Sequence, residues 1–311
     1  MIHTQAVTHT TRAELVRLEA DARALRLPVT GSARARPRGF QRSRLRGRGM
    51  TFAEVREYQP GDDIRTIDWR VTARRQSPHA KIYEEERERP VLLIADLGDT
   101  LFFASTGAYK QVRCAQATAL LAWLALGSGD QVGGLVFNNT ELETLKPARR
   151  KKAVVRLLDA LDRLQHQPSA PPVQPVPDAR LDRALQEARH AARTGSRVFI
   201  VSDFMAITDQ TVPLLAGLSR HNSVTALRIQ DPLEASLPER GQFSVASPSG
   251  PITFDAGNPA FRRAWQEKTG AHELRLEDTF RRAGMPWLTL STAQPPAEAL
   301  LGLIGAGGRL L

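Results

Sequence analysis

From residue 90 onward, short runs of hydrophobic residues alternate with longer stretches in which hydrophobic positions recur every three or four residues. The short runs are typical of buried strands, and the longer stretches are typical of amphipathic helices. Strands are expected at residues 91–95, 131–137, 141–145, 196–201, 223–229 and 287–290, and helices at 107–126, 149–164, 178–193, 208–220, 258–283 and 295–304. This alternation predicts an α/β fold, a parallel-rich central sheet with helices on both faces.

The chain before residue 90 follows a different pattern. A helix is expected at 11–27, followed by an arginine-rich loop and a densely charged segment, and residues 79–88 read as an edge strand. In the second half, residues 241–254 alternate like a β-hairpin, which makes an insertion at about 232–256. We therefore divide the chain into an N-terminal part, residues 1–89, and a sheet domain, residues 90–311.

Charge adds a candidate partner. The net charge is +10, and residues 34–48 hold seven arginines and no acidic residue. Nucleic acid would neutralise such a block through its phosphates. The block also fits an arm that packs on the protein's own acidic surface or stays solvated, because no nucleic-acid recognition fold accompanies it.

Cysteine content and hydropathy bear on the compartment. The single cysteine, Cys114, excludes a disulfide framework. The first residues lack the apolar core of a signal peptide, and the longest apolar run, residues 115–126, is too short to span a bilayer. These features predict a cytoplasmic protein without a membrane span.

The charged segment at residues 54–75 contains ten charged residues and two aromatic residues. One hypothesis is a loop locked by Arg–carboxylate pairs, with Tyr58 and Trp69 as apolar anchors. The other is a partner-binding surface, since Arg, Tyr and Trp dominate binding hot spots. The two hypotheses are compatible, and the partner-binding candidates are Arg56, Tyr58, Asp62, Asp63, Arg65, Asp68, Trp69 and Arg74.

Four motifs together resemble the bacterial domain-of-unknown-function 58 family. They are R-E-Y-Q-P-G-D-D-I-R-T-I-D-W at 56–69, R-P-V-L-L-I-A-D at 89–96, I-V-S-D-F at 200–204 and D-P-L-E-A-S-L-P-E-R-G at 231–241. Members of this family carry a von Willebrand factor A-like domain, so the resemblance implies that Rossmann-like fold. They are typically encoded beside MoxR-type AAA+ ATPases, which implies an adaptor or chaperone-like cofactor of such an ATPase.

The resemblance also implies a metal-ion-dependent adhesion site, D-x-S-x-S plus a later threonine and aspartate, at the carboxyl ends of the strands. Here Asp96 matches the first aspartate, Thr100 the second hydroxyl position and Asp203 the later aspartate. Gly98 replaces the first serine, and the threonine position falls near Ala179. This degenerate site would bind Mg²⁺ only if Asp99 or Asp178 compensates, and then weakly, and no cofactor is the expectation. Alternatively, Asp96 and Asp203 cap loops or bind an arginine across the strand ends.

Catalytic motifs are missing from the sequence. The seven histidines have no metal-protease spacing, and no G-x-S-x-G or phosphate-binding loop occurs. We expect a non-enzymatic protein-binding module. A nucleic-acid-binding protein that uses residues 34–48 is the alternative, and a magnesium-dependent hydrolase that uses Asp96 and Asp203 is the remaining class.

Overall fold

The structure is a computed structural model that describes residues 7–26, 50–59, 62–85, 90–166, 179–245 and 252–305. The arginine-rich block at 34–48 and the helix cap expected at Asp178 lie outside the described residues. The chain forms two compact units, one of residues 1–31 and 89–311 and a smaller one of residues 32–88.

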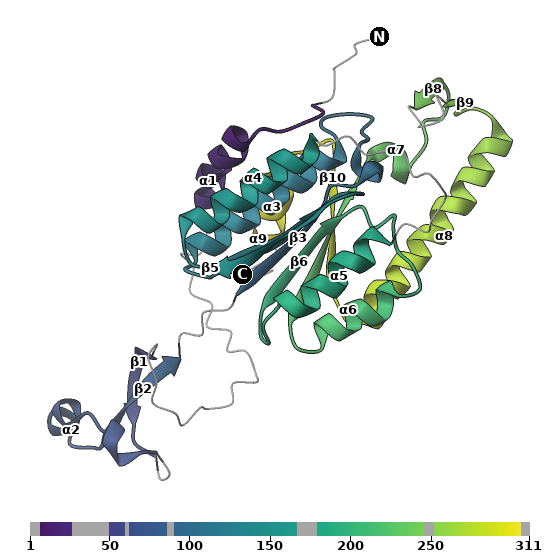
Figure 1. Ribbon diagram of the computed structural model, residues 1–311. Coiled ribbons are helices and arrows are strands. Elements are labelled where there is room, and N and C mark those ends of the chain that lie inside the picture. The colour runs from purple at the N-terminus through teal and green to yellow at the C-terminus, as the bar shows by residue number, and fades with distance from the viewer. Residues whose placement is uncertain are drawn as a thin grey trace. The chain divides into compact units, whose positions relative to one another are not determined.

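A six-stranded sheet forms the centre of the larger unit, in the order β10-β7-β6-β3-β4-β5 (Figure 1). Its neighbouring strands are parallel except for the pair β4 and β5, which is antiparallel. The expected mixed α/β architecture with a mostly parallel sheet is thus confirmed. The strands are β3 (Val91–Asp96), β4 (Val132–Phe137), β5 (Leu142–Ala148), β6 (Arg197–Ser202), β7 (Ser223–Gln230) and β10 (Trp287–Ser291).

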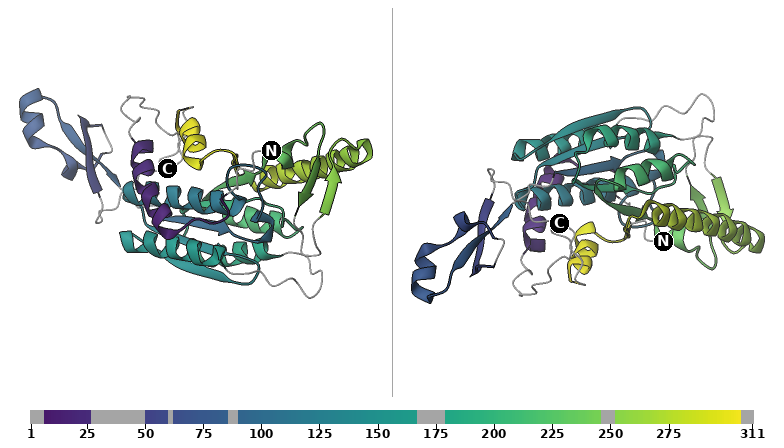
Figure 2. Two further views of the ribbon diagram at one scale, coloured as in Figure 1. Left: turned by 90° about the horizontal axis from the view of Figure 1, so that it is seen from above. Right: turned by 90° about the horizontal axis from the view of Figure 1, so that it is seen from below.

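Helices cover both faces of the sheet (Figure 2). The alternation of side chains along β3 shows why, since Leu93 and Ala95 join one hydrophobic core and Leu92 and Ile94 join the other. The first core is completed by α1 (Arg12–Arg26), α3 (Lys110–Gly127), α4 (Lys151–Gln165) and α9 (Pro296–Gly305). The second is completed by α5 (Arg180–Ala191), α6 (Thr211–Ser219) and α8 (Pro259–Ala283).

Helix α1 packs against α3, although residues 1–89 are expected to form a separate N-terminal part of the chain. Leu15 and Ala22 of α1 are buried in the first core. The indole Nε1 of Trp123 on α3 donates a hydrogen bond to the carbonyl of Leu15 at 3.0 Å. These contacts place α1 with the sheet domain.

Short elements complete the larger unit. A single 3₁₀ turn, η3 (Asp99–Leu101), follows β3, and a one-turn helix, α7 (Pro232–Ala235), follows β7. The expected hairpin is present as β8 (Gln242–Val245) and β9 (Ile252–Asp255), which pair antiparallel.

The smaller unit is more regular than the expected loop. Strands β1 (Met50–Glu57) and β2 (His79–Glu85) pair antiparallel, and η2 (Ile64–Thr66) and α2 (Trp69–Arg75) lie between them in the chain. The expectation that Trp69 is an apolar anchor is wrong, because its side chain is 69% exposed. Polar capping by Asp68 fixes the start of α2 instead.

Candidate functional site

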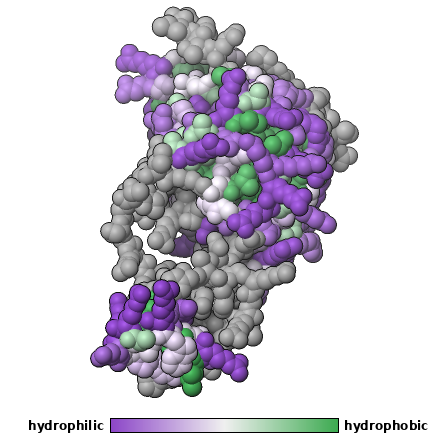
Figure 3. Space-filling model, turned by 90° about the vertical axis from the view of Figure 1, so that its left-hand side faces the viewer, coloured by the Kyte–Doolittle hydropathy of each residue, from purple (hydrophilic) through white to green (hydrophobic). Residues whose placement is uncertain are grey.

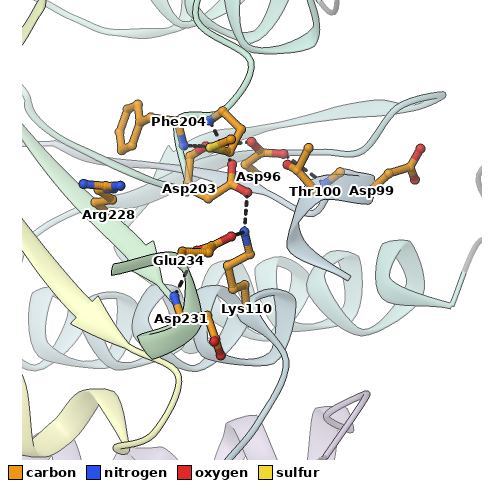
Figure 4. Close-up of polar contacts among 12 residues, drawn as sticks. Asp96, Asp99, Thr100, Lys110, Asp203, Phe204, Arg228, Asp231 and Glu234 are labelled. Atoms are coloured by element: carbon orange, nitrogen blue, oxygen red, sulfur yellow. Dashed lines mark hydrogen bonds and ion pairs between the residues drawn. The ribbon is translucent and has the colours of Figure 1, made fainter. Parts of the chain in front are cut away.

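Two buried aspartates lie at the carboxyl ends of neighbouring strands. Asp96 is the last residue of β3, and Asp203 directly follows β6. They are 1% and 2% exposed. Parallel strands bring their carboxyl ends to one edge, and Figure 4 shows the two carboxylates close together there.

Asp96 and Thr100 both contact the guanidinium of Arg180, the first residue of α5. Arg180 Nε lies 3.2 Å from Asp96 Oδ1, and its Nη2 donates to Thr100 Oγ1 at 2.6 Å. Ser202 Oγ donates to the other oxygen of Asp96 at 2.7 Å, and the backbone N–H of Gly98 donates to Oδ1 at 2.9 Å. The arginine therefore provides the positive charge that this carboxylate needs when buried.

Gly98 leaves room for this arginine. A Cβ atom at Gly98 would lie 2.2 Å from Arg180 Nε, which is closer than non-bonded atoms approach. A serine at this position, which the family resemblance implies, would therefore collide with the guanidinium as it lies here.

Asp203 contacts a different cation, Lys110 at the start of α3. Lys110 Nζ lies 2.9 Å from Asp203 Oδ2 and 2.6 Å from Glu234 Oε1, so one ammonium joins two carboxylates (Figure 4). Lys110 is 1% exposed. The backbone N–H of Met205 donates to Asp203 Oδ1, and the next residue after the aspartate, Phe204, has a left-handed φ of 55°.

The D-P-L-E motif holds Glu234 in place. Asp231 accepts a hydrogen bond from Leu233 N, and Glu234 accepts one from Asp231 N, which makes a capping box on α7. Asp231 also accepts hydrogen bonds from the Ser105 hydroxyl at 2.5 Å and the Thr292 hydroxyl at 2.6 Å. This buried aspartate therefore connects its own loop by hydrogen bonds to the loops that contain Ser105 and Thr292, at the same edge of the sheet.

The carboxylates do not fit the magnesium site that the resemblance implies. Asp96 and Thr100 converge on Arg180, whereas Asp203 converges on Lys110, so protein cations occupy the positions where their oxygens would bind a metal ion. Within the described residues, no cluster of three or more His, Cys, Asp or Glu side chains is arranged to hold a metal ion. Asp96 instead binds an arginine across the strand ends, Arg180, which is the alternative considered from the sequence.

The two aspartates have opposite pKa shifts. Burial raises the pKa of Asp96, and the nearby Asp203 carboxylate adds to this shift, although Arg180 acts against it. Burial also raises the pKa of Asp203, but the charge and hydrogen bond of Lys110 outweigh it, so the pKa lies below its ordinary value. For Lys110, the two carboxylates outweigh burial and raise the pKa.

These shifts predict how Asp203→Asn changes the dependence of stability on pH. Because the pKa of Asp203 is lowered in the folded chain, its ionised form contributes stability above the ordinary aspartate pKa of about 3.9, and this contribution is lost as pH falls through the lowered pKa. We expect Asp203→Asn to cost about 2 kcal/mol near neutral pH and progressively less below about pH 3.9. Urea denaturation of the wild type and the variant, near neutral pH and in acid, measures this difference in the free energy of unfolding. A difference that does not shrink in acid would contradict the lowered pKa of Asp203.

Sequence reasoning did not identify Lys110, Arg180 or Glu234 as site residues. Arg180 directly follows Ala179, which is near the expected threonine position, and Glu234 lies inside the D-P-L-E motif. A neighbouring motif in the sequence therefore pointed to each of these two residues. Lys110 had only its place at the start of an apolar helix.

In the smaller unit, most of the predicted partner-binding residues contact one another or the local backbone. Arg56 pairs with Asp62 at 2.7 Å, and the Tyr58 hydroxyl donates to the Asp62 carbonyl. Asp63 caps η2, and Asp68 caps α2. By contrast, exposed side chains in this unit include Ile64, Arg65, Trp69 and Arg74.

Comparison with known proteins supports the family resemblance. Residues 54–275 match the model of a family described as "Protein of unknown function DUF58". The uncharacterised proteins Rv1480 of Mycobacterium tuberculosis and Mb1516 of Mycobacterium bovis are each 30% identical over 277 residues, which cover 89% of this chain and 85% of theirs. YeaD of Bacillus subtilis is 34% identical over 77 residues, 25% of this chain and 18% of YeaD.

Similarity to solved structures is weaker. BatB from Bacteroides thetaiotaomicron has a TM-score of 0.45 and 11% identity, and covers 70% of this chain and 98% of its own. An aerotolerance-related membrane protein from Bacteroides fragilis has a TM-score of 0.43 and 14% identity, covering 70% and 99%. An uncharacterised membrane-spanning protein from Vibrio fischeri has a TM-score of 0.18 and 14% identity, covering 70% and 98%.

The predicted cytoplasmic location is corrected by these matches, because two of the similar structures are described as membrane proteins. None of the helices in the described part of the chain is long and apolar enough to cross a bilayer. The single cysteine, the lack of a signal-peptide core and the lengths of the hydrophobic runs do not report on where related proteins are found.

Proposed function

The chain belongs to the DUF58 family, and we propose that it is a non-enzymatic protein-binding module with a von Willebrand factor A-like sheet. In this proposal it acts as an adaptor or chaperone-like cofactor of a MoxR-type AAA+ ATPase. The family resemblance and the mostly parallel sheet support the fold assignment, and the resemblance supports the choice of partner.

Exposed hydrophobic side chains on the smaller unit are the observation that carries the protein-binding role. Trp69 and Ile64 are 69% and 65% exposed. Hydrophobic side chains of this unit reach the surface among hydrophilic ones (Figure 3). The unit around them is held by polar contacts, because Asp62 pairs with Arg56 and Asp68 caps α2 and pairs with Lys81. A unit held by such contacts that presents an exposed tryptophan has the properties of a binding hot spot.

The strand-end carboxylates support a non-enzymatic role. A catalytic base or nucleophile needs access to a substrate, but Asp96 and Asp203 are almost fully buried. Their oxygens already accept hydrogen bonds from Arg180, Ser202 and Lys110. Chemistry at these carboxylates would first require that their ion pairs break.

Trp69→Ala tests this function. We expect the tagged wild-type protein to recover an AAA+ ATPase from nuclease-treated native lysate, and the variant to recover at least about tenfold less, because a hot-spot residue contributes about 2 kcal/mol or more. Mass spectrometry identifies the partner, and parallel captures with ATP and with a chelator test nucleotide and metal dependence. We expect the chelator to have no effect.

Arg70→Ala is the matched control, because Arg70 is an exposed neighbour of Trp69 on α2. It should leave recovery within about twofold, as rim residues do. Equal recovery by Trp69→Ala and wild type would contradict the proposed surface. Recovery of nucleic acid before nuclease treatment and of no protein after it would contradict the adaptor role.

A further inference from the structure

The ionised groups that form the two buried ion-pair clusters at the strand ends are too buried to meet a partner, except Glu234. The side chains of Asp96, Arg180, Lys110 and Asp203 are between 1% and 5% exposed, whereas that of Glu234 is 25% exposed. Of these paired groups, Glu234 is therefore the one that a partner can reach.

Glu234 lines a groove of about 470 Å³ between α8 and the strands β7 and β10. Glu273 and Glu277 line it from α8, and Arg228 lines it from β7. The ionisable side chains of the groove are thus three carboxylates and one guanidinium, in a chain whose net charge is +10. Because the groove is locally acidic, it favours a cation and disfavours the phosphates of nucleic acid.

Not all of the charged side chains that line the groove have ion-pair partners within the described residues. Arg228 donates from Nη1 and Nη2 to the two oxygens of Glu273, each at 2.6 Å. Glu234 is paired with Lys110. Glu277 is exposed and has no ion-pair partner among the described residues, so its charge is available to a ligand.

Arg228 also needs a hydrogen-bond acceptor. It is 8% exposed, and its Nε has no hydrogen-bond partner within the described part of the chain. An unsatisfied buried donor is costly. The Nε atom is enclosed, so a carbonyl oxygen in the groove would satisfy it only after a shift of the Arg228 side chain. A peptide offers carbonyl oxygens together with a lysine or arginine side chain, whereas a free polyamine offers no acceptor.

The strand side of the groove suits an extended peptide. β10 is one of the two edge strands of the sheet, and its alternate residues Trp287 and Thr289 both line the groove. Trp287 is 45% exposed, and an exposed indole face attracts a cation. Extended peptides commonly pair with edge strands.

We infer that this groove binds an extended segment of a protein partner and accepts its lysine or arginine side chains. The inference rests on the proposed protein-binding function and specifies that the partner segment bound in this groove is basic. It also reverses the charge preference of a metal-dependent adhesion site, which takes an acidic side chain from its partner.

Fluorescence anisotropy with short labelled peptides of threonine and serine tests the inference on the full chain. One peptide carries lysine at alternate positions, a second carries arginine there, and a third carries glutamate. We expect the basic peptides to bind at least about tenfold more tightly than the acidic one. No binding of either basic peptide at about 1 mM, or equal binding of all three, would overturn the inference. Spermidine that binds as tightly as the lysine peptide would overturn the peptide assignment.

Gly270→Phe blocks the groove without straining the helix. Gly270 lines the groove from α8, and a Cβ there would have no neighbouring atom within 4 Å. We expect Gly270→Phe to weaken the basic peptides about tenfold or more, and Gly270→Ala, which adds only the Cβ, to leave their affinity within about twofold. Unchanged affinity in Gly270→Phe would place the peptide elsewhere.

Glu277→Gln removes one charge and keeps the side-chain shape. We expect about a tenfold loss of affinity for the basic peptides, and no loss in Glu267→Gln, an exposed α8 residue that does not line the groove. Trp69→Ala should bind the peptides like wild type. Loss of partner capture in Trp69→Ala without loss of peptide binding would therefore support both proposals, and peptide binding that fails while Trp69-dependent capture persists would overturn this inference alone.

Discussion

Replacement of Lys110 by methionine is expected to lower the free energy of unfolding by about 3–5 kcal/mol. Methionine keeps an unbranched apolar stem, so the packing of the side chain is largely preserved. The lost ammonium leaves Asp203 buried without its cation and removes the partner of Glu234. Breaking a buried ion pair from one side costs more than the pair contributes, because the remaining charge is not hydrated. Urea denaturation at neutral pH measures the change.

Lys151→Met is the control, because it is the same substitution at a surface ion pair. Lys151 Nζ lies 2.7 Å from Glu19 Oε2, but the Lys151 side chain is 61% exposed. We expect the control to cost less than about 1 kcal/mol. If Lys110→Met cost no more than Lys151→Met, the strand-end aspartate would not depend on Lys110.

The sheet could be predicted from sequence because its signals are local. Residues 91–95 of β3 form a continuous hydrophobic run, and all six residues of the strand, Asp96 included, are buried. Such a run between helical patterns indicates a parallel strand covered on both faces, whatever the rest of the chain does. Asp96 and Asp203 could be placed at one edge for the same reason.

The cations of the site could not be predicted because their partners are distant in sequence. Lys110 is 93 residues from Asp203, and Arg180 is 84 residues from Asp96. An ion pair between distant residues leaves no periodicity, and a lysine at a helix start is usually solvated. The smaller unit shows the related limit, since its charged segment contains a helix and a strand that hydrophobic periodicity does not reveal.

Gly98→Ser is expected to lower the free energy of unfolding by about 3 kcal/mol. The new Cβ would lie 2.2 Å from Arg180 Nε, so the guanidinium has to leave, and Asp96 then remains buried without its cation. The cost comes from the lost ion pair rather than from backbone strain, because the colliding atom belongs to a flexible side chain. Thermal or urea denaturation measures it, and a cost below about 1 kcal/mol would show that Arg180 is not needed at Asp96.

The double variant Gly98→Ser with Arg180→Ala tests whether Mg²⁺ can replace the arginine at Asp96, because it contains no guanidinium for the introduced serine to collide with. It removes the guanidinium and restores a hydroxyl between Asp96 and Thr100, which recreates the oxygen ligands that hard divalent ions prefer. We expect Mg²⁺ to stabilise the double variant, by about 2.7 kcal/mol at a hundredfold excess over its dissociation constant. Wild type should have the same unfolding midpoint with Mg²⁺ and with a chelator, because its strand-end carboxylates already accept hydrogen bonds from Arg180 and Lys110. A wild-type midpoint that falls on addition of the chelator would mean that the strand-end aspartates hold a metal ion after all.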